Sequence, residues 1–341
     1  MRIERLGRDR TSVEGYVRFQ QKFWPDRFGA DTWEALLLKY FDHPDADCCP
    51  GSGIYACMEG DEILGVQAAY PFPVVKNGTR YAGHMLVDWG ALQDKDKGPL
   101  FRAAVGGQLF RTLVELPGRK YASIGSPDAM RNLACRATRI PSVFSVTLLS
   151  PVKAALVRYA KLSSVVRPIS LCTALKVASG KVEVLTGADL EGFQPTPPDG
   201  TFSVYHSPEF WRALGLARRT TGAVRLKLGT DVTLGEFILQ VKGSGNLHLA
   251  TLLSSRFESE DQTAIRKMGR ILSETLQKWN VCALFATESD IRVSRLLRAV
   301  SLFRRAHPSE WWSIPRPSDT FAATEVKWWL TGAERDGAWA Y

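Results

Sequence analysis

Two titratable side chains, His84 and Asp88, stand four residues apart in residues 80–92, a stretch whose composition predicts a β-strand. Because successive side chains of a strand point to opposite faces, this spacing places His84, Leu86 and Asp88 on one face. The other face then takes Met85, Val87 and Trp89. A carboxylate and an imidazole can both exchange protons near neutral pH, so the pair is a candidate for acid–base chemistry. The structural alternatives are a carboxylate satisfied by backbone N–H groups and a core histidine.

The cysteines suggest no metal site and no disulfide framework. They are scattered, with no CxxC pair and no histidine at zinc spacing. We therefore expect buried or half-buried free thiols, including the adjacent pair after His43. The six are Cys48, Cys49, Cys57, Cys135, Cys172 and Cys282.

Helices and strands that could position these residues follow in a clear order through the first half. Apolar spacing predicts two amphipathic helices, then three strands joined by turns at Glu59-Gly60-Asp61 and Lys76-Asn77-Gly78. A helix opened by Pro99 comes next, because proline is tolerated in the first helical turn. The expected ranges are helices at 13–23, 32–41, 99–116, 129–137 and 151–162, and strands at 54–59, 63–70, 80–92, 120–124 and 143–149.

The second half repeats this order of elements. A helix opening at Ser207-Pro208-Glu209 precedes three strands, a long helix over 260–279, a strand and a final helix over 291–300. Between the halves, residues 194–200 are rich in proline and end in glycine, which marks an extended connection. We therefore expect an α/β protein with domains at 1–162 and 201–341, joined by a connecting segment at 163–200.

Length and charge are consistent with this division. A chain of 341 residues suits two hydrophobic cores. The net charge of +9 favours anionic partners such as CoA phosphates, nucleotide sugars, tRNA or an acidic surface. The sequence contains no apolar run of membrane-spanning length and no apolar stretch near its start, so we expect no membrane span and a cytoplasmic location.

Several segments resemble bacterial two-domain members of the GNAT (Gcn5-related N-acetyltransferase) superfamily. In the first half these are an aromatic helix over 33–40, a meander strand over 62–67, and a strand and loop running from Val87 to Phe101. In the second half they are Ser207-Pro208-Glu209-Phe210-Trp211 and the segment 327–332. The resemblance implies two halves with central, mainly antiparallel, splayed sheets flanked by helices.

The resemblance also implies a place for an acyl-CoA cosubstrate, acetyl-CoA or a longer one, at the start of the helix that Pro99 opens. The residues it assigns to binding are Val87, Trp89, Lys97, Gly98, Leu100, Phe101 and Arg102. The phosphate-binding loop departs from the family pattern, because Asp96 replaces an arginine and Pro99 lacks an amide donor. Residues 254–264 of the second half contain no glycine, so the donor site is expected in the first half.

By the same resemblance, the strand over 80–92 borders the acyl group. Asp88 then becomes the first candidate for the base or the amine anchor, with His84 as its alternative. Ser126 lies where two strands separate, and Cys135 stands in the helix where many relatives carry a tyrosine acid. A routine helix start and an inert core thiol are the structural alternatives for Ser126 and Cys135.

The expected function is therefore acyl-CoA-dependent N-acyl transfer to a small amine, such as an amino sugar or an amino acid. Two alternatives remain open. A FemAB-like aminoacyl-tRNA-dependent transferase would also have two such halves and would make tRNA the one expected nucleic-acid partner. A non-catalytic tandem GNAT protein would fit the altered phosphate loop.

Overall fold

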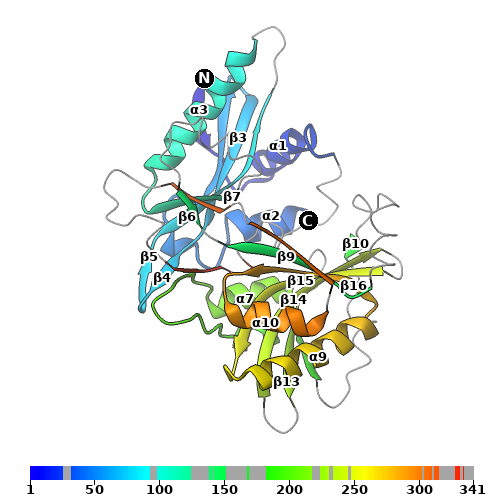
Figure 1. Ribbon diagram of the computed structural model, residues 1–341. Helices are drawn as coiled ribbons and strands as arrows, with labels where there is room; N and C mark the ends of the chain where they lie inside the picture. Colours follow the sequence, from blue (N-terminus) through cyan, green and yellow to red (C-terminus); the bar gives the residue numbers. More distant parts are fainter. Residues whose placement is uncertain are drawn as a thin grey trace. The chain divides into compact units, whose positions relative to one another are not determined.

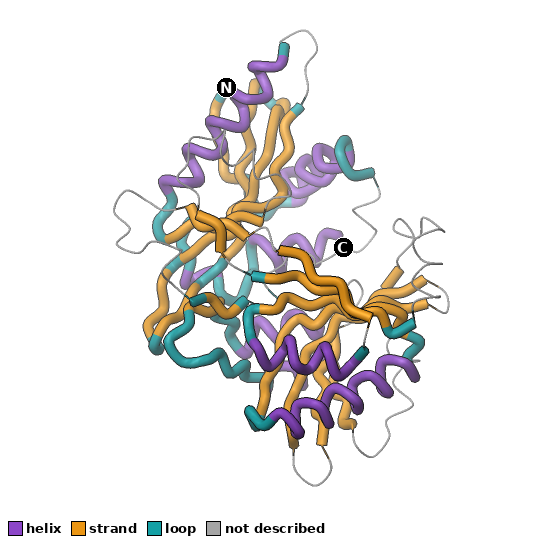
Figure 2. Tube along the Cα trace, in the orientation of Figure 1, coloured by secondary structure: helices purple, strands orange, loops and turns teal. Residues whose placement is uncertain are grey.

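The computed structural model describes residues 1–25, 32–92, 98–123, 138–140, 142–150, 167–168, 182–216, 223–229, 233–244, 247–301, 303–308, 311–314, 327–330 and 333. They belong to two compact units. Unit 1 comprises residues 1–140 and 310–327, and unit 2 comprises 141–309 and 328–340. Each unit has a β-sheet flanked by helices (Figure 2). None of the described helices is both long enough and apolar enough to cross a membrane.

Unit 1 is built on a seven-stranded sheet whose neighbouring strands are antiparallel except for the parallel pair β6 and β7. In sheet order the strands are β1 (Arg2–Arg5), β2 (Gly53–Glu59), β3 (Glu62–Pro71), β6 (Gly83–Ala91), β7 (Arg119–Ser123), β18 (Trp311–Ile314) and β8 (Thr138–Ile140). A hairpin of β4 (Val74–Lys76) and β5 (Thr79–Tyr81) precedes β6. Its turn has positive φ at Asn77 and Gly78, which confirms the turn expected there.

Helices cover both faces of this sheet. Helices α1 (Arg10–Gln21) and α2 (Thr32–Tyr40) contact β3, and α3 (Pro99–Glu115) lies on the opposite face from α1 (Figure 1). A short 3₁₀ helix, η1 (Ala46–Cys48), follows α2. The apolar stripe of α3, with Val105, Leu109 and Leu113, is fully buried against the sheet, as its spacing predicts.

Unit 2 repeats the design with one parallel pair, β15 and β16, in an otherwise antiparallel sheet. In sheet order the strands are β11 (Val182–Thr186), β13 (Ala223–Gly229), β14 (Thr233–Ser244), β15 (Leu247–Phe257), β16 (Val281–Glu288), β9 (Val143–Leu148) and β17 (Phe303–Pro308), and β10 (Arg167–Pro168) pairs with β14. Helices α9 (Gln262–Lys278) and α10 (Ile291–Val300) pack side by side and bury a large apolar core (Figure 1).

Shorter elements complete unit 2. The 3₁₀ helix η3 (Gly187–Gly192) packs against α7 (Pro208–Leu216). Strand β12 (Phe202–Val204) pairs in parallel with β19 (Trp328–Trp329). This pairing fixes the segment near the C-terminus of the chain within unit 2.

Along the sequence, the chain changes from one sheet to the other at different residues from those that the sequence predicts. The strand at 143–149 was expected in the domain ending at 162, but β9 lies between β16 and β17 of unit 2. Conversely, β18 follows all the helices of unit 2 and lies between β7 and β8 of unit 1. Alternating polarity tells which face of a strand is buried but not which sheet the strand joins, so the boundaries 1–162, 163–200 and 201–341 do not follow the observed units.

Candidate active site

The parallel strands β6 and β7 are paired over only part of their length. Residues Gly83–Leu86 pair with Arg119–Ala122, whereas β6 continues as a strand to Ala91. Among the described residues, the ladder between β6 and β7 ends at Leu86 and Ala122, and beyond Leu86 β6 is paired with β3. That β6 and β7 separate from this point on, as the resemblance implies, stays a prediction.

A β-bulge lies in β6 directly after the last of these pairs. Ala68 of β3 faces Val87 and Val66 faces Gly90, so Gln67 alone opposes both Asp88 and Trp89. Asp88 has φ of 55°, in the left-handed region that non-glycine residues rarely adopt. Bulges re-aim side chains beside active sites, and such strained residues persist only where their surroundings hold them.

The bulge changes which side chains share a face, so the expected grouping of His84 with Asp88 is wrong. Leu86 packs in the core formed with α3, and His84 shares its face by the normal alternation. Asp88 instead meets side chains of α1 and α2. The extra residue shifts the alternation by one, and Trp89 turns toward α3, where its ring lies against Gly106.

The Asp88 carboxylate is buried and already has hydrogen-bond and ion-pair partners. Tyr16 Oη donates to Asp88 Oδ2 at 2.8 Å, and Tyr40 Oη donates to the same oxygen. Lys39 Nζ lies 3.6 Å from Oδ2, and both charged side chains are only 1% exposed. Gln20 Nε2 donates to the backbone carbonyl of Asp88 at 2.9 Å. These contacts favour a positioning role for Asp88 over direct proton exchange with an amine.

These partners were not expected from the sequence, although a helical stripe indicated them. Leu36, Lys39 and Tyr40 follow the spacing of one buried helix face, and all three are buried. A lysine on such a face requires a buried anion. Only the fold shows that the anion is Asp88, far along the sequence.

A second polar pair lies nearby on β3 and the segment after α2. The backbone N–H of Asp45 donates to His43 Nδ1 at 3.0 Å, so a neutral His43 ring carries its proton on Nε2. That nitrogen lies 3.0 Å from Tyr70 Oη and donates to it. His43 and Tyr70 are both buried.

His84 has the surroundings of a core residue. It is fully buried, and its Nε2 lies 3.3 Å from the backbone carbonyl of Cys49. Burial raises the pKa of the Cys49 thiol to about 11, so this cysteine stays protonated and unreactive at neutral pH. The four described cysteines, Cys48, Cys49, Cys57 and Cys282, are free and buried or half-buried, as expected.

Most of the residues expected to bind CoA are described, and several of them lie at the start of α3. Gly98 precedes the helix with φ of 73°, and Leu100 in the first turn is 82% exposed. The guanidinium carbon of Arg102 lies 5.0 Å from the centre of the Trp89 ring, which is 43% exposed. Val87 pairs with β3 next to the bulge, and Phe101 packs on the α3 core. Lys97, Ser126 and Cys135 lie outside the described residues.

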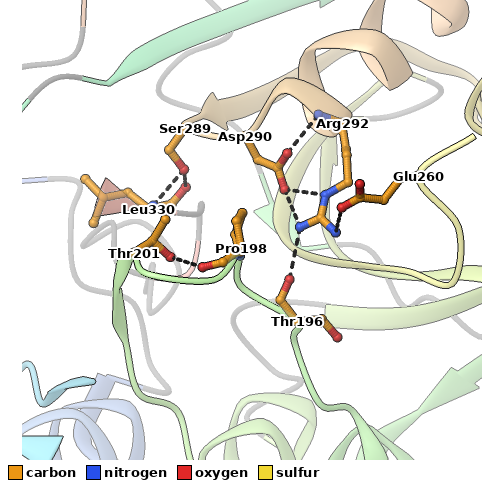
Figure 3. Close-up of polar contacts among 8 residues, drawn as sticks. All are labelled: Thr196, Pro198, Thr201, Glu260, Ser289, Asp290, Arg292 and Leu330. Atoms are coloured by element: carbon orange, nitrogen blue, oxygen red, sulfur yellow. Dashed lines mark hydrogen bonds and ion pairs between the residues drawn. The ribbon is translucent and has the colours of Figure 1, made fainter. Parts of the chain in front are cut away.

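In unit 2 the parallel strands β15 and β16 part, and residues from near the C-terminus lie beside them. The ladder between β15 and β16 ends at Leu252 and Ala286, next to a bulge at Leu253. The backbone N–H of Ala333 donates to the Leu253 carbonyl at 2.8 Å. Ser289, just after β16, donates to the carbonyl of Leu330 at 2.6 Å and accepts from its N–H at 2.7 Å (Figure 3). Ala333 thus contacts the bulge of β15, and Leu330 contacts the residue that follows β16.

The corner between β16 and α10 is further fixed by a buried ion pair. Asp290 caps α10 by accepting from the N–H of Arg292, and its Oδ2 lies 2.7 Å from Arg292 Nη2. The same Arg292 nitrogen donates to the carbonyl of Thr196 at 3.1 Å (Figure 3). These contacts hold the corner in place for Ser289.

Comparisons with known proteins bear on the fold of the chain. No protein-family profile and no curated protein matches the sequence. Among solved structures, a conserved Enterococcus faecalis protein described as a probable N-acyltransferase is similar with a TM-score of 0.56 and 10% identity, over 92% of this chain and 72% of that one. A GCN5-related N-acetyltransferase from Kribbella flavida gives 0.53 and 11%, over 92% and 71%.

A Saccharomyces cerevisiae N-myristoyltransferase with bound myristoyl-CoA gives a TM-score of 0.50 and 11% identity, over 96% of this chain and 84% of that one. The chain therefore has a fold like that of these GCN5-related N-acetyltransferases, with two units that each contain a mixed, mainly antiparallel sheet. This confirms the fold that the sequence resemblance implied.

Proposed function

We propose that this protein is an acyl-CoA-dependent N-acyltransferase whose acyl donor binds in unit 1. The observation that carries the proposal is the strained bulge at Asp88, which directly follows the last described pair between the parallel strands β6 and β7. Helix α3 begins at Pro99, eight residues after β6 ends at Ala91, and Gly98 is its N-cap. A thioester between the strands would meet backbone of the bulge on one side and a helix N-terminus on the other.

The reaction needs few groups from the protein. The amine nitrogen attacks the thioester carbonyl carbon, the carbonyl oxygen gains negative charge, and the C–S bond breaks to release CoA thiolate. Backbone N–H groups at the bulge are suited to stabilise that oxygen. The first-turn N–H groups of α3 and the cation of Arg102 would attract the CoA phosphates, although Pro99 contributes no donor. Solvent water takes the ammonium proton before attack, and the second proton lost from the nitrogen as the C–S bond breaks neutralises the CoA thiolate.

We assign no acyl donor to unit 2. Its bulge carbonyl at Leu253 already binds Ala333, and its corner residue Ser289 already binds Leu330. A thioester at the same place would have to displace that backbone. The acceptor we propose is a small amine, such as an amino sugar or an amino acid, that approaches β6 from the α1 and α2 side.

A thermal-shift screen of the full chain with CoA, acetyl-CoA, octanoyl-CoA and palmitoyl-CoA tests the proposal. A ligand at one hundred times its dissociation constant stabilises the protein by about 2.7 kcal/mol. We expect at least one acyl-CoA to raise Tm by several degrees. If none of the four does, the donor assignment is wrong.

Two glycines of the α3 region form a matched pair that locates the donor. An added Cβ meets nothing within 4 Å at either Gly98 or Gly107, but only Gly98 has positive φ. Gly98→Ala therefore strains the start of α3 and should weaken acyl-CoA binding about tenfold or more, measured by calorimetry. Gly107→Ala should leave binding unchanged and stabilise the helix by up to about 1 kcal/mol. Equal binding by both variants would place the phosphates elsewhere.

A further inference from the structure

We infer that Tyr16, Tyr40 and Lys39 are positioning residues that act through Asp88, holding the β6 bulge so that its backbone can polarise the acyl carbonyl. This inference rests on the proposed function and adds to it the residues that make the site. None of the three needs to touch the substrate. They would influence the reaction only by fixing the backbone conformation of Asp88.

The first step of the argument is the conformation of Asp88 itself. Its φ of 55° is unfavourable for any residue with a Cβ, although aspartate tolerates it better than most. Without support, the strand would return to regular pairing with β3. The backbone groups at Asp88 and Trp89 would then point in the ladder directions of an ordinary strand.

The second step is that both the carboxylate and the backbone carbonyl of Asp88 have hydrogen-bond partners. Its carboxylate oxygen Oδ2 receives the hydroxyls of Tyr16 and Tyr40 and faces Lys39 Nζ at 3.6 Å. Its backbone carbonyl accepts from Gln20 Nε2 at 2.9 Å. Rotation about the backbone of Asp88 would break contacts at the side chain and at the carbonyl together. The bulge is therefore determined by its surroundings rather than by the strand.

The third step is that the contacts come from two helices. Tyr16 and Gln20 lie one turn apart on α1, and Lys39 and Tyr40 are consecutive on α2. The Tyr16 and Tyr40 rings also meet edge to face, with centres 6.4 Å apart. The Lys39 ammonium neutralises the buried carboxylate, so the cluster is neutral as a whole. Helices α1 and α2 thus set the geometry of the strand that they cover.

The test uses a readout that needs no acceptor. The acyl-CoA that stabilises the wild-type protein most in the thermal-shift screen is prepared with ¹³C at the thioester carbonyl. Its carbonyl stretch is measured by isotope-edited infrared spectroscopy, free and bound. Hydrogen bonding from the bulge should lower the stretching frequency in the wild-type complex. In the variant Tyr16→Phe/Tyr40→Phe that shift should be reduced or lost, while the dissociation constant changes less than threefold.

Tyr55→Phe is the matched control. Tyr55 is buried in β2 and its hydroxyl donates to the Gly51 carbonyl at 2.7 Å, so this variant also loses one buried tyrosine hydroxyl. Its ring packs in the core on the α3 side of the sheet. It should keep the wild-type carbonyl shift. Once an acceptor is known, the double variant should lower kcat about 10²-fold with little change in KM for the acyl-CoA.

The outcomes separate the inference from the proposed function. If no wild-type complex forms with any acyl-CoA of the screen, the proposed function fails, and the inference fails with it. If the complex forms but the double variant keeps the full carbonyl shift, the inference alone is overturned. If the double variant does not fold, Tyr16→Phe and Tyr40→Phe are measured singly, and an unchanged shift in both again overturns it.

Discussion

At the scale of single residues, Asp88 combines a strained backbone with a carboxylate that already has several partners. The side chain is 1% exposed and lies among Tyr16, Tyr40 and Lys39. A general base must reach the proton that it removes, directly or through one water. We therefore assign Asp88 a positioning role, in which it maintains the conformation of the bulge in β6. We propose that solvent water, rather than this carboxylate, takes the proton from the amine.

A paired substitution distinguishes these two roles of Asp88. Asp88→Asn/Lys39→Met removes both charges together, which avoids leaving an unpaired buried ammonium. Asparagine tolerates positive φ and still accepts from the tyrosines. A positioning role predicts kcat within about tenfold of wild type, whereas a catalytic base predicts a loss of about 10² or more. Steady-state kinetics with a responsive amine gives the answer, and Asp88→Ala, which removes both functions, should be slow in either case.

At the scale of elements, Leu330 and Ala333, which follow β19, contact unit 2 where β15 and β16 part. Ser289 contacts Leu330 twice, and Ala333 reaches the bulge at Leu253. The bulge of β6 in unit 1 is proposed to receive a substrate, whereas the bulge of β15 in unit 2 binds backbone of the chain itself.

Ser289→Ala tests how much the hydrogen bonds between Ser289 and Leu330 stabilise unit 2. The change removes two hydrogen bonds and leaves backbone groups of Leu330 without their partner, so we expect a loss of about 1–3 kcal/mol in the free energy of unfolding. Ser294→Ala on α10 is a control of the same chemistry at a half-buried position and should stay within about 0.5 kcal/mol. Urea denaturation followed by circular dichroism measures both. Equal stabilities would show that the Ser289 contacts contribute little.

At the scale of the whole molecule, each sheet depends on a strand from a distant part of the sequence. β9 completes the sheet of unit 2, and β18 lies between β7 and β8 of unit 1. A fragment ending at residue 162 lacks β18, so its β7 and β8 edges have no strand between them. Unpaired edges of this kind promote aggregation.

We therefore expect fragment 1–162 to be insoluble or unfolded by itself. Fragments 1–140 and 141–341, cut at the boundary between the units, should form a complex when produced together, because the second carries β18. Ser313→Pro in the second fragment should abolish the complex, since proline removes a hydrogen-bond donor from a central strand, whereas Ser313→Ala should preserve it. Co-purification of the two fragments measures this. A stable, folded fragment 1–162 would contradict the dependence on β18.

The amino-acid sequence by itself determined the local structure and the general fold. Apolar spacing located α3, α9 and α10 and their buried stripes, and Asn77-Gly78 marked the hairpin turn, because these features depend on neighbours within a few residues. The order of such elements, with the resemblance that it carries, gave a tandem GNAT-type fold. The free state of the four described cysteines also followed from their spacing.

Only the tertiary structure decided the face on which Asp88 lies, the partners of Asp88, and which sheets β9 and β18 join. A bulge arises from pairing with another strand, and the one extra residue at Asp88 reverses the alternation on which the sequence argument depended. Lys39 and Asp88 are 49 residues apart, and β18 meets β7 across nearly 200. Contacts over such separations depend on how the whole chain folds back on itself, which no local pattern of residues encodes.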